Sequence, residues 1–448
     1  MAIISQENEK EKSQNKNILK FSQNFQISKL LEKCNVKKAK GVGVTTVFNR
    51  LLSIAFTGRS LNRLLESHNL DGKKDVFYRF MNCVSANWYK FIRLLSTAVI
   101  ACILNVNVEK ELPVLILDDT IHKRDRSKNV ELLTRVRDHN DGRYYRGFRC
   151  LTLGLHTADT FIPVDFRLLS SKKEESRING MRTDLDKRTV GYQIRAKAIS
   201  GAYEMAFDMI GKQHSGARHV LFDSWFSKPV MFKELLKMGL HGIGMLKAEK
   251  GVFCRFLGKP YSLANLYAKV KDFLHKEGQY VTIGVELLDG TPFSITFVRS
   301  KQNKRDWLAL GTTDMTLSGR EVIGIYSRRW NIEVFFKTVK SFLGFAKECQ
   351  CRSFDAVVCS VAIVFTRYLM LVWINNDSPK RESMGQLFFK LIDEMNVCSF
   401  SEALDMVIAE ITRVIVHIDN FLDMSIRCFL NTLPDCFSAF RRSFSCET

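Results

Sequence analysis

The chain lacks several sequence patterns that mark well-defined protein classes. Its twelve cysteines are scattered, and only Cys349 and Cys351 lie two positions apart, with no second pair to complete a zinc site. There is no Ser-His-Asp order of a hydrolase and no glycine-rich loop of the kind that cradles phosphates. No internal repeat of fixed period is present. The sequence therefore does not support a zinc finger, a serine hydrolase, a P-loop protein or a repeat protein.

Secretory and membrane segments are also lacking. The N-terminal stretch MAIISQENEKEKSQNK is polar and charged, so a cytosolic protein with reduced thiols is expected. One apolar run, residues 356–374, is long enough to cross a bilayer. Arg367 interrupts this run and nothing else in the chain favours insertion, so we interpret it as a buried core helix. We expect no membrane partner.

Acidic residues are too few to balance the basic ones. The chain has 67 lysines and arginines against 47 aspartates and glutamates, a formal net charge of +20 at pH 7. Such an excess indicates a polyanionic partner, with nucleic acid preferred over an anionic membrane. A basic protein without such a partner is the alternative, because net charge describes association and not fold.

The N-terminal quarter has a polar start followed by a helical, basic pattern. The length of 448 residues predicts two to four structural units. Residues 1–25 are polar and are expected to be disordered. Residues 26–108, which include KKDVFYRFMN at 73–82, are expected to form a helical basic DNA-binding domain. A plain helical unit with a solvated basic face is the alternative.

The pattern changes from helical to mixed at residue 113. The apolar run PVLILDD predicts a strand, and residues 149–157 and 160–170 predict a hairpin with a two-residue connection. A helical stretch, a strand at 219–226, a helix and a strand at 241–247 follow. Together these segments predict a mixed α/β core.

A β-rich unit interrupts this core. Residues 249–312 contain two alternating apolar runs joined by Asp289-Gly290, which predicts a β-hairpin. The chain returns to a helical pattern after this unit and remains helical beyond residue 375.

Acidic residues stand at the ends of two predicted strands. Asp118 and Asp119 end the first strand, and Asp223 ends the strand at 219–226. Ligands of α/β proteins bind at the ends of sheet strands, so these carboxylates are candidates for one site. The alternative is that each of them simply begins a polar loop.

A third segment, YSRRWNIEVFFKTVK, adds a glutamate. Taken as one continuous helix, it places Tyr326, Arg329, Glu333 and Lys340 within a sector of roughly 60° beside an apolar stripe. A solvated charged ridge is the alternative. Converging carboxylates would raise one another's pKa, and a divalent cation relieves the repulsion. Mg²⁺ prefers oxygen ligands, and two such ions suit phosphodiester chemistry.

These segments together resemble a known family. The spacing Tyr-x2-Arg-x3-Glu-x6-Lys, filled as RRWNIEVFFKTVK, resembles the signature of the insertion-sequence-4 family of DDE transposases. LDDT and FDSW resemble the strands that carry the first and second acids, and the β-rich unit resembles the family's insertion. The similarity covers about residues 110–375. Ser224, Trp225 and Phe226 depart from the charged residues usual after the second acid.

The resemblance implies a fold class and a division of the chain. The class is α/β, an RNase H-like mixed sheet flanked by helices, with a β-rich insertion and helical N- and C-terminal parts. The catalytic core would comprise residues 109–248 and 313–375, separated by the insertion at 249–312. A C-terminal helical region would follow at 376–448.

The resemblance also implies a two-metal site. Asp223 would bridge two Mg²⁺ ions, for which Mn²⁺ can substitute, while Asp119 and Glu333 would each complete one of the two sites. The burial pattern of the first strand does not separate Asp118 from Asp119. Asp119 is preferred because the family places a threonine directly after its first acid, and Thr120 follows here.

DNA contacts are implied for four further residues. Tyr326, Arg329 and Lys340 would contact phosphates at the transposon end. Trp307 begins the stretch WLALGTTD, which resembles the strand whose tryptophan stacks on a base flipped from the duplex. A core tryptophan is the alternative interpretation.

The implied function is metal-dependent cut-and-paste transposition, with strand nicking, hairpin formation and strand transfer. The expected partners are double-stranded DNA, both terminal inverted repeats and target, and a second copy of the chain in the DNA complex. The expected location is the bacterial cytoplasm, at the nucleoid. An RNase H-like nuclease without strand transfer and a catalytically dead DNA-binding relative are the alternatives.

Overall fold

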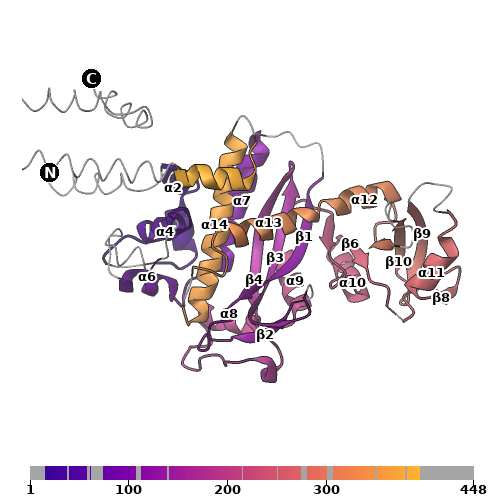
Figure 1. Ribbon diagram of the computed structural model, residues 1–448, viewed down its shortest axis with the longest axis horizontal. Helices are drawn as coiled ribbons and strands as arrows, with labels where there is room; N and C mark the ends of the chain where they lie inside the picture. The colour runs from indigo at the N-terminus through magenta and orange to yellow at the C-terminus, as the bar shows by residue number, and fades with distance from the viewer. Residues whose placement is uncertain are drawn as a thin grey trace, which may run out of the picture.

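The structure is a computed structural model of the whole chain (Figure 1). It describes residues 16–37, 40–57, 61, 74–106, 112–138, 141–213, 215–249, 251–273, 280–299, 306–348, 351–378 and 381–393. The expectations for residues 1–15 and for residues 394–448, most of the C-terminal helical region, lie outside the described residues.

One mixed sheet of eleven strands runs through the described residues. The strands are β1 (Val114–Lys123), β2 (Thr134–Arg137), β3 (Tyr144–Thr157), β4 (Thr160–Leu169), β5 (His219–Phe222), β6 (His241–Leu246), β7 (Cys254–Phe256), β8 (Lys259–Tyr261), β9 (Tyr280–Leu287), β10 (Pro292–Arg299) and β11 (Trp307–Thr312). β3 pairs antiparallel with β1, β2 and β4, whereas β5 lies parallel to both β1 and β6. The order β4-β3-β1-β5-β6 is that of an RNase H-like core, so the predicted fold class is confirmed.

Helices connect and cover the parallel strands of this core. Residues 114–117 of β1 and all of β5 are buried, as expected for parallel strands covered on both faces. The crossover from β4 to β5 carries α8 (Val190–Ala198) and α9 (Ala202–Ile210), and α10 (Pro229–Lys237) links β5 to β6. The sequence predicted one continuous helix where the structure has α8 and α9. Residues 199–201 are not helical and separate the two.

Both predicted hairpins are present. The turn between β3 and β4 consists of Ala158 and Asp159, with φ of 46° and 56°. Positive φ at both positions gives the local twist that a two-residue hairpin needs. Gly290, with φ of 85°, lies in the turn between β9 and β10.

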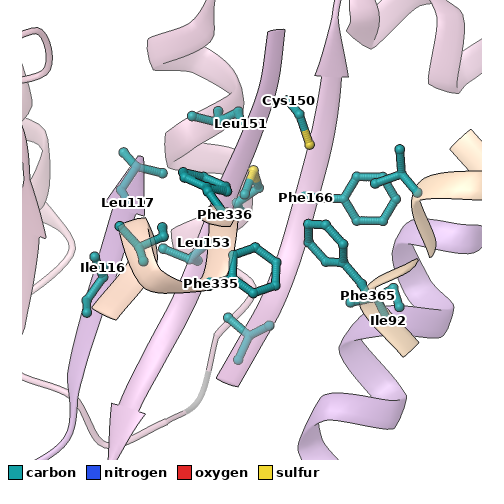
Figure 2. Packing of buried hydrophobic residues seen from close by; sticks show 14 of the residues in the cluster. Ile92, Ile116, Leu117, Cys150, Leu151, Leu153, Phe166, Phe335, Phe336 and Phe365 are labelled. Carbon is teal, nitrogen blue, oxygen red and sulfur yellow. The ribbon is translucent and has the colours of Figure 1, made fainter. Parts of the chain in front are cut away.

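The segment that carries the predicted signature is two helices and not one. Helix α12 (Gly319–Ser327) ends just before α13 (Trp330–Ser341), and Arg328 and Arg329 lie between them. The single-helix geometry assumed for Tyr326 to Lys340 is therefore wrong for its first turn. α13 still packs its apolar side inward, with Phe335 against Phe161 and Phe365 at centroid distances of 5.3 and 5.1 Å. Figure 2 shows Phe335 and Phe365 in this cluster.

The long apolar run forms α14 (Phe354–Asp377), which crosses the core next to α13 (Figure 1). This helix is long and apolar enough to cross a membrane, but 89% of its most apolar 18-residue window is buried inside the protein. The interpretation as a core helix is confirmed. Arg367 is fully buried there and donates hydrogen bonds to the backbone oxygens of Leu51, Leu52 and Leu343. Arg367 also forms an ion pair with Glu348 at 2.7 Å, and this pair together with the backbone acceptors explains how an apolar helix tolerates a charge.

Helices cover one end of the core. In the described residues they are α2 (Lys16–Asn24), α3 (Ile27–Lys33), α4 (Val44–Ser53), the short 3-10 helix η1 (Ile54–Phe56), α6 (Lys74–Met81) and α7 (Trp88–Val106). The expected disorder of residues 1–25 does not extend to α2. Ile18 and Phe21 of α2 are buried, and Phe21 contacts Trp373 of α14 at 5.8 Å between ring centroids. This burial offsets the polarity of the rest of α2.

The β-rich unit continues the same sheet instead of forming a separate one. β11 pairs antiparallel with β6, and β10, β9, β7 and β8 follow in order. Helix α11 (Leu263–Val270) packs within this unit. Figure 1 shows the unit at the opposite end of the molecule from α4 and α6.

Candidate active site

A cleft of about 820 Å³ opens where β1 extends beyond its neighbour β5. Its acidic lining comes from β1, from the residue after β2, from the loop after β5 and from α13. Its basic lining comes from the end of β1, from β2, from β3 and from α13 and the loop that follows. The charged lining residues are Asp118, Asp119, Asp138, Asp223, Glu333, Lys123, Arg137, Arg149, Arg329, Lys337, Lys340 and Lys347. The cleft therefore brings together all the carboxylates that the sequence singled out.

Strand register places Asp118 beside Asp223. The last registered pair of the parallel strands β1 and β5 is Leu117 with Phe222, and the two aspartates follow directly. Register neighbours on parallel strands point to the same face of a sheet. Burial, and next the negative charge of Asp223, raise the pKa of Asp118 to about 7. The two carboxylates are therefore close enough to repel each other.

Arg329 joins Asp118 to the glutamate of α13. Its Nη1 donates to Asp118 Oδ2 at 2.9 Å, and its Nη2 pairs with Glu333 Oε1. The guanidinium supplies positive charge between two carboxylates that would otherwise repel. Asp118 and Glu333 therefore share one cation, and Asp223 lies beside Asp118 in the same cleft.

Asp119 has different surroundings. Successive residues of a strand point to opposite faces, and Asp119 pairs with Arg149 of β3 instead of Arg329. The Arg149 guanidinium also lies 5.0 Å from the ring centroid of Trp225. The sequence interpretation missed Arg149, and no spacing or motif around it could have indicated this pairing.

The loop after β5 holds Asp223 in place. The backbone nitrogens of Trp225 and Phe226 donate to Asp223 Oδ1 at 3.1 and 3.3 Å. Ser227 Oγ donates to the Asp223 backbone oxygen at 2.9 Å. The departure from the family pattern in this loop thus places Trp225 where its ring meets Arg149.

The other predicted DNA contacts are only partly brought together. Lys340 lines the cleft, and burial lowers its pKa. Tyr326 is not among the lining residues, although Arg329 lies 5.9 Å from its ring centroid. Burial raises the pKa of Tyr326 to about 12, so it remains a phenol at neutral pH.

Trp307 lies apart from the cleft, in β11. Its indole stacks on Tyr267 of α11, with centroids 4.3 Å apart and an interplanar angle of 15°. Phe297 of β10 meets it edge-on at 5.6 Å. One face of the indole therefore already has an aromatic partner.

The donor set of the cleft fits a hard divalent cation. Within the part of the chain that the structure describes, no three His, Cys, Asp or Glu side chains are gathered closely enough to hold a metal as they stand. The available donors are carboxylate oxygens, which Mg²⁺ and Mn²⁺ prefer. The repulsion between Asp118 and Asp223 and the position of Arg329 both show that positive charge is favoured there.

Comparison with known proteins gives one family match. Residues 48–261, just under half of the chain, match a family described as DDE superfamily endonuclease. The match includes Asp118, Asp119 and Asp223 but ends before Glu333. No curated protein matches the chain.

Among solved structures, the chain is similar to a piggyBac transposase in a synaptic complex with hairpin DNA, determined by cryo-electron microscopy. The two are 11% identical, with a TM-score of 0.45, over 85% of this chain and 81% of that one. This likeness is too distant to support a functional argument.

The family match and the cleft geometry agree. The matched region supplies two strands whose acids meet at one edge of the sheet, and α13 brings a glutamate to the same place. Enzymes of this type generally depend on divalent metal ions. Residues 48–261 are therefore similar to a DDE superfamily endonuclease, and this match supports an enzyme that is a nuclease or a transposase.

Proposed function

We propose that this chain is a DNA transposase of the insertion-sequence-4 type and that its cleft cuts transposon ends. The observation that carries the proposal is that Asp118, Asp223 and Glu333 line one cleft, in which Arg329 pairs with Asp118 and Glu333. Bacterial cytoplasm, at the nucleoid, is the proposed place of action.

The basic lining of the cleft suits a DNA backbone. Lys123, Lys337, Lys340 and Lys347 line it together with Arg137. Cations that replace the counterions of phosphates supply most of the affinity of such proteins for DNA. In the proposed complex Lys340 and Arg329 contact phosphates that flank the scissile one. The ring of Tyr326 contacts the Arg329 guanidinium and holds it in position.

Asp223 would be a ligand of two Mg²⁺ ions, or of Mn²⁺ in their place. Glu333 would complete the ligand set of one ion, and one aspartate of β1 would complete that of the other. When bound, such ions make water a stronger nucleophile and stabilise the leaving oxygen. We prefer Asp118 to Asp119 as the β1 ligand because it is the register neighbour of Asp223. Arg329 would then exchange its two carboxylates for a phosphate, which accepts the same bidentate hydrogen bonds.

In the proposed reaction a water oxygen attacks the phosphorus at the end of the element. The bond from phosphorus to the 3′ oxygen breaks, which leaves a 3′-hydroxyl and a 5′-phosphate. The freed 3′-hydroxyl attacks a phosphodiester of the opposite strand, which closes a hairpin and releases the flanking DNA with a 3′-hydroxyl. Water hydrolyses the hairpin phosphodiester and restores the 3′-hydroxyl of the element, which then attacks a target phosphodiester and displaces a 3′-hydroxyl of the target. In this scheme Trp307 would stack on the flipped base, and the enzyme would act as a DNA-linked homodimer.

Separate measurement of binding and cutting tests this proposal. Asp223→Asn and Glu333→Gln should leave DNA affinity within a few-fold of the wild type. Nicking of a plasmid that carries the gene and its flanking DNA, in Mg²⁺ or Mn²⁺, should fall at least about a hundredfold. Asp289→Asn, in the distant turn between β9 and β10, is the matched control and should nick normally.

Two outcomes would favour the alternatives. Wild-type protein that binds this DNA but never nicks it would be a catalytically dead relative. Wild-type protein that nicks but never joins pre-cleaved ends to a second DNA would be a nuclease without strand transfer.

A further inference from the structure

The hairpin of β2 and β3 presents a strongly basic face outside the catalytic carboxylates. Along β2 the burial alternates, with Thr134 and Val136 inside and Arg135 and Arg137 exposed. Exposed Arg146 lies on the facing part of β3. Sequence periodicity alone did not single out this face.

Strand register places like charges directly opposite each other on this face. Arg135 is the register partner of Arg146, and Arg137 is the partner of Tyr144. Like charges at directly opposed positions destabilise a strand pair. Tyr144 is 69% exposed, although it is a large aromatic residue. Neither arrangement stabilises the hairpin, so both point to a ligand.

Nearby acids do not explain these arginines. Within the described residues, no ion pair joins Arg135, Arg137 or Arg146 to a carboxylate within 4.0 Å. Asp138 pairs with Lys123 at 3.5 Å, and Asp141 accepts a hydrogen bond from the Tyr145 hydroxyl. The guanidinium groups are therefore available to an external anion.

This face continues from the cleft. Arg137, which belongs to this face, also lines the cleft. Arg135, Arg146 and Tyr144 line an adjoining surface hollow of about 440 Å³, together with Glu175. A polyanion that leaves the cleft along β2 would therefore meet these side chains next.

We propose that the exposed face of the β2–β3 hairpin binds the backbone of duplex DNA beside the segment that is cut. This inference rests on the proposed function and adds a DNA contact to it. Arg135, Arg137 and Arg146 bind phosphates, and Tyr144 packs against the sugars between them. Arg135 and Arg137 are two strand positions apart, about 7 Å. Phosphates of one strand rise 3.4 Å per base pair, so both guanidiniums reach phosphates of one strand.

Salt dependence of DNA affinity tests this contact. The experiment uses the full chain with Glu333→Gln, so that DNA stays intact, and a duplex taken from the DNA that flanks the gene. Arg135→Ala, Arg137→Ala and Arg146→Ala are combined in one variant. Lys259→Ala, Lys269→Ala and Lys271→Ala, at exposed positions of the β-rich unit, form a control with the same change in net charge.

The hairpin variant should weaken binding at least tenfold at moderate salt. It should also lower the slope of log affinity against log salt by about 2 to 3, close to one for each lost phosphate contact. Its thermal midpoint should not fall, because removal of the Arg135–Arg146 repulsion cannot destabilise the strand pair. Equal slopes in the hairpin and control variants would overturn the inference, whereas the proposed function depends on the separate nicking assay.

Discussion

Asp118 and Asp119 are adjacent in β1 but meet different partners. Asp118 shares Arg329 with Glu333 and adjoins Asp223, whereas Asp119 pairs with Arg149 on the other face of the strand. A one-residue step along a strand reverses the side to which the side chain points. Which of the two aspartates is the catalytic acid therefore depends on which face of β1 turns toward Asp223. Substitution of each aspartate can answer this question.

The first prediction compares the two aspartates by cleavage. Asp118→Asn should lower the nicking rate at least about a hundredfold, because it removes an oxygen charge beside Asp223. Asp119→Asn should lower it less than about tenfold, because its effect passes through Arg149. The reverse ranking, measured with equal DNA occupancy, would restore Asp119 as the first acid.

His122 of β1 is buried among aromatic rings. Its ring lies 5.0 Å from that of Phe345, edge to face, and 6.4 Å from that of Phe148. Burial, and next the charge of Arg124, lower the pKa of His122 to about 3. The folded protein therefore keeps this imidazole neutral at neutral pH.

A second prediction concerns stability in acid. The unfolded chain protonates His122 below about pH 6.5, whereas the folded chain does so only near pH 3. The contribution of His122 to the free energy of unfolding is therefore fully present above pH 6.5. Below that pH it falls by on the order of 1 kcal/mol per pH unit. His122→Phe should make the free energy of unfolding fall less steeply between pH 6 and 4 in urea titrations. Identical slopes for variant and wild type would contradict this account.

At the scale of elements, a buried arginine ties α8 to α14 and to the segment before β2. Arg195 donates to both oxygens of Asp355 at 2.9 and 2.7 Å and to both oxygens of Glu131 at 2.6 and 2.7 Å. Burial alone would raise the pKa of Glu131, but the hydrogen bond from Arg195 lowers it below its usual value. The contact fixes α14 against the sheet and thereby supports the position of α13.

The third prediction follows from this contact. Arg195→Met would leave two carboxylates without their partner and should cost about 3–5 kcal/mol of the free energy of unfolding. Denaturant titration measures the change. Arg188→Met, which removes an exposed arginine paired with Asp186, should leave the midpoint nearly unchanged. A small effect of Arg195→Met would mean that packing alone holds α14.

At the scale of the whole molecule, opposite charges meet in one place. The chain carries a formal charge of +20, yet its central cleft gathers five carboxylates among its cations. Bound metal ions would thus neutralise the carboxylates of the cleft, and the phosphates of bound DNA would neutralise its cations. Among these acids, Asp118 and Asp223 repel each other.

A fourth prediction is that divalent cations stabilise the protein without DNA. Millimolar Mg²⁺ or Mn²⁺ should raise the thermal midpoint by about 1–3 °C relative to NaCl of equal ionic strength, because ligands that bind only the folded state stabilise it. Asp223→Asn should lose most of this shift. An equal shift in both proteins would place the ions elsewhere on the surface.

Local features of the fold were predictable from the sequence. The apolar run before Asp118, the turn at Asp289-Gly290 and the buried helix around Arg367 each depend on neighbouring residues. The candidate acids could also be named, because each follows an apolar strand or lies on an amphipathic helix. The helix of α2 was missed because its burial depends on Trp373, far away in the chain.

The sequence by itself determined which segments become strands and helices and which acidic residues end them, because periodicity and turn chemistry act over a few positions. Tertiary structure alone decided that Asp118 adjoins Asp223, that Arg149 pairs with Asp119 and that Arg135 opposes Arg146. These contacts depend on the register and packing of segments distant in the chain. A register shift of one residue would exchange every one of them while leaving each local pattern unchanged.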